Sequence, residues 1–243
     1  MKLIKNTIAK VVQTLYRNVA TSAELGFDLG DTPDPLFGYM SGTPLDRYLI
    51  SQEFERVIAK DIFSDRKLGL EIGGTEYLRS HFGNSIAVQL DYQENTHLQL
   101  VDKYKLVGDL SISQANVTDY FDLIISTQLL SFVKDEVQAI ENFRKLLKTG
   151  GVVIGTEPLV SPISIYDDSR WGENHRYSPK SLKALLETQF EILHFKSLGN
   201  AATSAAVVLG VPVERFNKQL LNIERPSHAT CMFYVARTIA SYV

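Results

Sequence analysis

The sequence predicts an α/β fold built on a mostly parallel sheet with helices on both faces. Three observations support this prediction: short apolar runs recur along the chain, helical patterns separate several of them, and the first run ends in glycines at a sharp turn. The chain has 243 residues, which is enough for one large domain of this kind with additions at its ends.

The predicted strands are short apolar runs bounded by turn residues. In chain order they cover residues 67–73, 85–91, 104–109, 121–126, 152–156, 190–195 and 229–235. The clearest helix covers residues 134–148, where apolar residues share one face and a basic last turn precedes Gly150 and Gly151. Helical character is also expected over residues 45–63 and from Ser181 onward.

An N-terminal helical extension and lid is predicted for residues 1–62, ahead of the main domain at 63–243. Residues 1–18 place apolar side chains at helical spacing, with basic residues mostly off that stripe. One interpretation is a helix that packs on the domain or on a second subunit. The other is weak peripheral contact with an anionic membrane surface. Residues 26–44 are rich in Gly, Pro and Asp, which indicates an irregular connection.

The composition argues against several classes of protein. A net charge of −3 gives no basic excess for nucleic acid, so no nucleic-acid partner is expected. No apolar run approaches the ~18 residues that span a bilayer, and no secretion signal is evident. The single cysteine, Cys231, cannot form an internal disulfide. These features predict a cytoplasmic protein.

Carboxylates close three successive predicted strands. Glu71, Asp91 and Asp109 each stand at the carboxyl end of an apolar run, and parallel strands bring such ends to one crevice where ligands bind. Asp91 follows Glu71 by twenty residues, the position at which doubly wound folds hold a ribose hydroxyl pair. Gly73 and Gly74 let the backbone turn sharply there. The alternative is that each carboxylate is only a turn residue.

The ordered motifs LGLEIGG, VQLD, VGDL, YFDLIISTQLLSFVKD and AIENFRKLLKTGGVVIGTEP resemble those of class I S-adenosylmethionine-dependent methyltransferases, in particular the methyltransferase type 11 group. The flanking segments GYMSGTPLDRYLI, RWGENHRYSPKSLKALLE and SLGN resemble methyltransferase-like proteins from bacterial surface-polysaccharide clusters. The resemblance covers roughly residues 36–238. It implies a Rossmann-like class I methyltransferase fold with a mostly parallel seven-stranded sheet, in a domain at 63–243.

The same resemblance implies S-adenosyl-L-methionine as the cofactor. It places Glu71 and Gly73 at the amino-acid end of the cofactor, Asp91 at the ribose and Asp109 at the adenine. The expected cofactor-binding residues are Glu71, Gly73, Gly74, Thr75, Asp91, Asp109, Leu110, Thr127 and Gln128. One departure from the family pattern is that Thr75 and Tyr77 occupy the positions of the second and third glycines of the usual turn.

Methyl transfer to a hydroxyl needs in-line positioning and a base for the hydroxyl proton. His175 is the first candidate for the base, because its ordinary pKa lies near neutrality. In the alternative, Asp168 acts with Asp167 and Glu173 by binding a divalent cation, although no metal is expected by default. The expected substrate contacts are Tyr39, Arg47, Tyr48, Trp171, Arg176, Tyr177 and Asn200.

The predicted function is O-methylation of a sugar or glycan hydroxyl in surface-polysaccharide (O-antigen) biosynthesis, with a glycosyltransferase as a candidate partner. The alternative, prompted by the replaced glycines, is a non-catalytic methyltransferase-like scaffold module of a glycan-assembly complex. A nicotinamide-dependent dehydrogenase shares the acidic strand ends but needs the G-x-G-x-x-G spacing, which the turn after Glu71 lacks.

Overall fold

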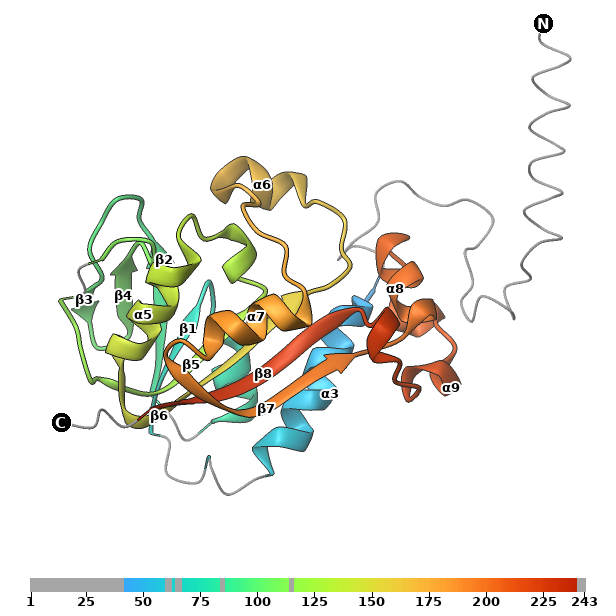
Figure 1. Ribbon diagram of the computed structural model, residues 1–243, viewed down its shortest axis with the longest axis horizontal. Coiled ribbons are helices and arrows are strands. Elements are labelled where there is room, and N and C mark those ends of the chain that lie inside the picture. Colours follow the sequence, from blue (N-terminus) through green and yellow to red (C-terminus); the bar gives the residue numbers. More distant parts are fainter. Residues whose placement is uncertain (1–41, 60–62, 64–66, 84–85, 114–115, 240–243) are drawn as a thin grey trace, which may run out of the picture.

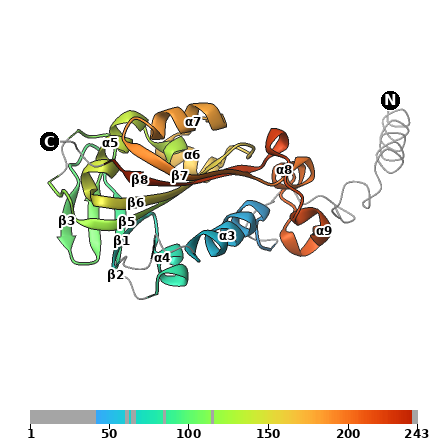
Figure 2. The same ribbon diagram turned by 60° about the horizontal axis from the view of Figure 1, so that its bottom comes forward.

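The computed structural model describes residues 42–59, 63, 67–83, 86–113 and 116–239. In these residues the chain forms one sheet of eight strands with helices packed on both faces (Figures 1 and 2). The predicted amphipathic helix at 1–18 and the predicted substrate residue Tyr39 lie outside the described residues. Within the described part of the chain, no helix is both long and apolar enough to cross a bilayer.

The sheet has the order β3-β4-β2-β1-β5-β6-β8-β7. The strands are β1 (Leu68–Ile72), β2 (Ile86–Tyr92), β3 (Gln99–Asp102), β4 (Lys105–Gly108), β5 (Phe121–Thr127), β6 (Leu147–Pro158), β7 (Phe190–Leu198) and β8 (Cys231–Thr238). Strands β4, β2, β1, β5 and β6 pair in parallel, and β8 is antiparallel to both β6 and β7. The predicted mostly parallel α/β sheet is confirmed.

The prediction of seven strands misses β3. This strand pairs antiparallel with β4 across a two-residue turn at Lys103 and Tyr104, at the outer edge of the sheet. Its side chains are largely exposed, so the sequence there lacks the apolar run that marks the other strands. Short, polar edge strands of this kind are common, because they discourage pairing with other chains.

The helices begin at clear capping signals. Asp135 accepts a hydrogen bond from the N–H of Gln138 at the start of α5, and Ser178 with Ser181 forms a capping box ahead of α7. Helix α5 ends earlier than predicted, because β6 begins at Leu147. The helices are α3 (Leu45–Ile58), α4 (Glu76–His81), α5 (Glu136–Leu146), α6 (Ile165–Trp171), α7 (Pro179–Leu186), α8 (Ala201–Val208) and α9 (Lys218–Leu221), with 3₁₀ turns η2 (Leu130–Phe132), η3 (Val213–Arg215) and η4 (Pro226–His228).

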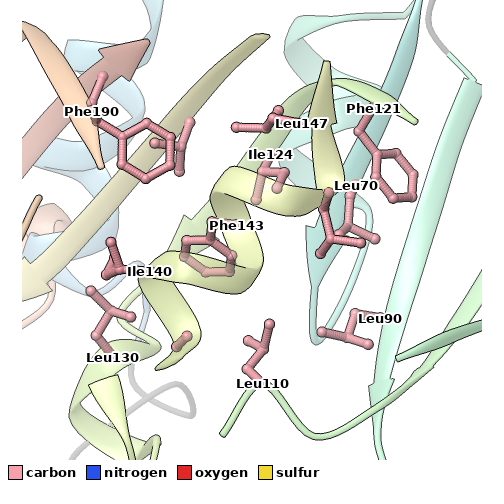
Figure 3. Packing of buried hydrophobic residues seen from close by; sticks show 14 of the residues in the cluster. Leu70, Leu90, Leu110, Phe121, Ile124, Leu130, Ile140, Phe143, Leu147 and Phe190 are labelled. Atoms are coloured by element: carbon pink, nitrogen blue, oxygen red, sulfur yellow. The ribbon is translucent and has the colours of Figure 1, made fainter. Parts of the chain in front are cut away.

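Two hydrophobic layers hold the helices to the sheet. On one face α5 and α7 cover the strands, and Figure 3 shows Ile140 and Phe143 of α5 among side chains of the sheet such as Ile124. On the other face lie α3 and α4 (Figure 2). There Phe54 packs edge-on against Phe233 with ring centroids 5.1 Å apart. Each fully buried side chain of this size contributes about 1.5–3 kcal/mol. Helix α3 is thus part of the core, although the predicted domain boundary at 62/63 places it in the extension.

A buried carboxylate ties α3 to β7. Glu53 lies with its oxygens 3.0 Å from Nε2 of His194 and 3.1 Å from Nζ of Lys196. Nη1 of Arg56 lies 3.1 Å from Oε2 of Glu53. Nζ of Lys196 also pairs with Oε1 of Glu224, at 2.7 Å. Burial alone would raise the pKa of Glu53, but these hydrogen bonds and charges hold it at about 2. Glu53 therefore stays ionised through the neutral range.

Gly155 is required where β6 meets β8. It pairs in register with Tyr234, and a Cβ at this position would overlap the fully buried Tyr234 ring. We expect Gly155→Ala to lower the free energy of unfolding by about 1–3 kcal/mol, because a tightly packed ring has to shift. Urea denaturation measures the loss. The matched control is Gly69→Ala, where the new methyl group meets the mobile end of Leu78; equal losses in both variants would contradict this account.

Candidate functional site

Three carboxylates lie at one edge of the sheet, as the sequence predicts. Glu71 and Asp91 are near the carboxyl ends of β1 and β2, and Asp109 directly follows β4. These three parallel strands are neighbours in the order β4-β2-β1. Their carboxyl ends therefore form a continuous edge, which is where ligands bind in open α/β sheets.

Glu71 organises the turn after β1. Its carboxylate is buried and accepts hydrogen bonds from the backbone N–H groups of Tyr77 at 3.2 Å and Leu78 at 2.8 Å. These are unpaired donors at the start of α4, so Glu71 acts as a distant helix cap. Burial raises the pKa of Glu71, and the two hydrogen bonds oppose that rise. The side chain thus holds the Gly73–Thr75 turn against the sheet.

The turn itself leaves room for a ligand. Gly73 has φ +79°, a left-handed conformation that favours glycine, and no described atom lies within 4 Å of the position its Cβ would take. At Gly74 the carboxylate of Glu76 folds back against the backbone and accepts the N–H of Thr75 at 3.1 Å. Two carboxylates, Glu71 and Glu76, therefore flank an open stretch of backbone.

Tyr77, which replaces a glycine of the usual turn, packs away against α3. Its ring stacks on Phe54 with centroids 4.9 Å apart, and its hydroxyl lies 3.4 Å from Nη1 of Arg47, which donates to it. Burial raises the pKa of this phenol. The bulky side chain thus fills space between α3 and α4, and the departure from the family pattern has a packing role.

Asp91 and Asp109 differ in their surroundings. Asp91 is 39% exposed, with Nζ of Lys105 at 2.6 Å and Nε2 of Gln89 donating at 2.8 Å. Asp109 is buried and accepts the backbone N–H of Ser111 at 2.8 Å and of Asn95 at 3.3 Å. Asp91 is therefore within reach of solvent, whereas Asp109 holds the loops that follow β2 and β4 through its hydrogen bonds. Leu110, the next residue, is buried in the core.

The end of β5 meets the start of α3. Gln128, which follows Thr127, has φ +51° although it is not glycine, and its backbone N–H donates to Thr156 O at 2.7 Å. Its side-chain amide donates to Oδ2 of Asp46 at 2.7 Å. A strained conformation held by two elements is typical of functional sites. Arg47, the residue after Asp46, donates a hydrogen bond to the hydroxyl of Tyr77. Tyr48 instead packs toward α8 and α9.

The segment before α7 carries the predicted base. Nε2 of His175 lies 2.9 Å from Oε2 of Glu136 at the start of α5, and the two side chains are only 24% and 29% exposed. The two atoms are not aligned as a hydrogen bond, so Nε2 is buried with no hydrogen-bond partner among the described residues. The ring of Tyr177 is 6.0 Å away, centroid to centroid. The backbone N–H groups of Asn174 and His175 both donate to Ser131 O, at 2.7 and 3.1 Å. His175 is therefore fixed to η2 and α5.

The other predicted residues of this segment make mostly local contacts. Trp171 meets Phe132 edge-on with centroids 6.2 Å apart, and the hydroxyl of Tyr177 is 3.4 Å from Leu130 O. Asp168 accepts the N–H of Glu173 at 2.9 Å, and Arg176 donates to Ser161 O at 3.0 Å and pairs with Glu173.

Neither Asp168 nor Asn200 gains support from the geometry. Among the described residues, no three His, Cys, Asp or Glu gather around one metal position, so the structure gives no support to the cation alternative for Asp167, Asp168 and Glu173. The Asn200 amide caps α8 and donates to Leu220 O and Ile223 O, so its capacity is used within the protein. The roles of Asp168 and Asn200 stay predictions.

Two carboxylates near the site were not predicted. Glu136 follows Asp135 in an ordinary helix start, and Glu157 lies at the end of β6 inside the motif KTGGVVIGTEP. The signal for Glu157 is a carboxylate at the end of a strand, the same signal as for Glu71, Asp91 and Asp109. A separate open pocket of about 410 Å³ lies at the opposite, amino-terminal edge of the sheet, where Asp122 pairs with Lys148.

Comparisons with known proteins bear on the fold of the chain. Residues 71–155 match a family model described as a methyltransferase domain, and no curated protein matches the sequence. The structure resembles an S-adenosylmethionine dependent methyltransferase from Mesorhizobium loti at 17% identity, covering 79% of this chain and 99% of that chain, with a TM-score of 0.51. It also resembles the N-methyltransferase NodS from Bradyrhizobium japonicum, solved with S-adenosyl-L-homocysteine, at 16% identity, 93% and 97% coverage and a TM-score of 0.48.

The matched segment runs from the end of β1 into β6 and contains the three strand-end carboxylates. The Mesorhizobium structure shows the same fold. The family match supports a methyltransferase domain over this segment, carried on that fold.

Proposed function

We propose that this protein is an S-adenosylmethionine-dependent O-methyltransferase that acts on a sugar or glycan hydroxyl in surface-polysaccharide biosynthesis. The observation that carries the proposal is the row of Glu71, Asp91 and Asp109 along one edge of the sheet, beside the open turn at Gly73. This arrangement offers separate polar partners along one edge of the sheet, as an extended nucleoside cofactor requires.

The residues at this edge suit the chemistry of the cofactor. Glu71 and Glu76 give the turn a negative character, which favours the ammonium and sulfonium charges of the methionine end. The carboxylate of Asp91, whose side chain is 39% exposed, would hold the ribose hydroxyls, and Asp109 with Leu110 would line the adenine. When bound, the cofactor supplies an electrophilic methyl group, which bonds to the acceptor oxygen as the carbon–sulfur bond breaks and its electron pair stays on sulfur.

His175 is proposed as the base. The carboxylate of Glu136 lies 2.9 Å from Nε2 without being aligned as a hydrogen bond. A small rotation of the ring would direct the Nε2 proton to Glu136 and leave Nδ1 to take the proton of the acceptor hydroxyl. Glu136 then stabilises the imidazolium that forms, in the way that the aspartate of a catalytic triad does. Trp171, Arg176 and Tyr177 are proposed to contact the sugar, because aromatic faces and a cation suit a ring with hydroxyl groups.

Location and partners are part of the proposal. The sequence motivates a cytoplasmic protein that works with a glycosyltransferase, with weak membrane contact through residues 1–18. Resemblance of the flanking segments to proteins of polysaccharide clusters supports this context.

Calorimetric titration of the full chain with S-adenosylmethionine and S-adenosylhomocysteine tests the first step. We expect both to bind, and Gly73→Val to weaken both by blocking the open turn. Absence of binding at about 1 mM, the upper end of common KM values, would contradict the enzyme proposal. If a glycosyltransferase were then captured equally well by wild type and by variants of Glu71 and Asp91, the scaffold alternative would be favoured.

A further inference from the structure

A fully buried carboxylate lies on one side of η2, and the segment from Trp171 to Tyr177 that contains His175 lies on the other. Glu157, at the end of β6, is 0% exposed. Its Oε1 accepts the backbone N–H of Leu130 at 2.9 Å, and its Oε2 accepts the hydroxyl of Ser131 at 2.8 Å. Both donors belong to η2. The side chain therefore fastens this short turn to the sheet.

On the side away from Glu157, η2 contacts the segment from Trp171 to Tyr177 that precedes α7. Ser131 O accepts the N–H groups of Asn174 and His175, and the hydroxyl of Tyr177 lies 3.4 Å from Leu130 O. Phe132, the last residue of η2, meets the ring of Trp171. A change in how Glu157 holds η2 is thus transmitted to both ends of this segment.

We propose that Glu157 is a positioning residue, which fixes η2 and through it the place of His175. The role of His175 in this inference rests on the proposed function. The coupling from Glu157 through η2 to Trp171 does not, because it follows from hydrogen bonds and packing alone. This difference allows the two ideas to be tested separately.

The two protonation states of Glu157 require different hydrogen bonds. As a carboxylate, it accepts from both Leu130 and Ser131. As a carboxylic acid, it keeps the bond from Leu130 but donates its own proton to the hydroxyl of Ser131, which has to rotate. Titration of Glu157 therefore reverses the direction of its hydrogen bond with Ser131, while the bond from Leu130 stays the same.

The surroundings place this titration near neutrality. Burial raises the pKa of Glu157 from 4.5 to about 7, although the donors of η2 oppose the rise. Tyr177 and Tyr234 face it from the segment before α7 and from β8, and the pKa of each phenol is raised by burial and by the charge of Glu157. Both phenols thus stay neutral, while Glu136 and His175 lie beyond Tyr177.

The sign of the effect on stability follows from these values. The folded state keeps the proton on Glu157 up to a pH of about 7, whereas the unfolded state loses it near 4.5. Unfolded chains thus bind fewer protons between these values, so this group makes the free energy of unfolding fall as pH rises from 4.5 to about 7.

Fluorescence of Trp171, the single tryptophan of the chain, reports on η2 without any ligand. We expect the wild-type emission to change with pH with a midpoint near 7. Glu157→Gln should abolish the change, because its amide accepts from Leu130 and donates to Ser131 as the protonated acid does. His175→Gln should keep the change, and so should Glu187→Gln, a control at the exposed end of α7.

Two results would overturn the inference: a flat wild-type curve across the neutral range, or a transition that survives in Glu157→Gln. The enzymatic arm adds that Glu157→Ala, if circular dichroism shows it folded, lowers kcat by up to about 100-fold while S-adenosylhomocysteine binds as before. In Glu157→Gln the rate should lose the part of its pH dependence centred near 7. If the wild type transfers no methyl group, the proposed function fails, and the fluorescence result still decides the role of Glu157.

Discussion

Glutamine in place of His175 is expected to lower kcat for methyl transfer by roughly 10²–10⁴-fold, the usual contribution of a general base. The amide has a similar shape and leaves the backbone hydrogen bond to Ser131 in place, but it cannot take a proton from a hydroxyl near neutral pH. Because His175 is held by η2 and α5 and not by the turn at Gly73, affinity for S-adenosylhomocysteine should be unchanged. Single-turnover kinetics with a sugar acceptor, together with calorimetry, measure the two quantities.

The matched control is His228→Gln. That histidine is exposed in η4, where Nδ1 lies 2.9 Å from the hydroxyl of Ser227, and its replacement should leave kcat unchanged. Glu136→Gln should lower kcat less than His175→Gln does, because the base remains but its imidazolium is less stabilised. A His175→Gln enzyme within a few-fold of wild type would show that another group, or none, takes the proton.

The central parallel strands β1, β5 and β6 could be predicted because they are buried on both faces along most of their length. Leu123, Ile124 and Ile125 of β5 are all fully buried, so the strand reads as an unbroken apolar run. The same reasoning located the carboxylates at the strand ends, since Glu71 and Asp91 interrupt such runs at the edge. Strand β3 has mostly exposed side chains and carried no comparable pattern.

Contacts between distant residues could not be predicted from local patterns. Glu136 and His175 are brought together by η2, and the four hydrogen bonds of the Asn200 side chain depend on α8 and on carbonyl groups near α9. The position of Tyr77 is a further case. Its sequence position suggested crowding of the turn, whereas the structure stacks it on Phe54 of α3, which lies more than twenty residues earlier.

The largest expected effect on cofactor affinity is that of Asp91→Ala. A carboxylate that holds two ribose hydroxyls makes two charge-assisted hydrogen bonds, each worth about 1.5–3 kcal/mol. Their loss corresponds to a fall in affinity of roughly 100-fold or more for both S-adenosylmethionine and S-adenosylhomocysteine. Calorimetric titration of each compound measures the change.

Loss of folding would not explain such a result. Asp91 is 39% exposed and its pair with Lys105 is a surface ion pair, worth only about 0–1 kcal/mol of stability. Asp102→Ala is the control, because this carboxylate lies in the neighbouring edge strand β3 and accepts the N–H of Tyr104 instead of facing the crevice edge. If Asp91→Ala bound both compounds as tightly as Asp102→Ala, the ribose would lie elsewhere, and the row of strand-end carboxylates would have to be explained as turn residues.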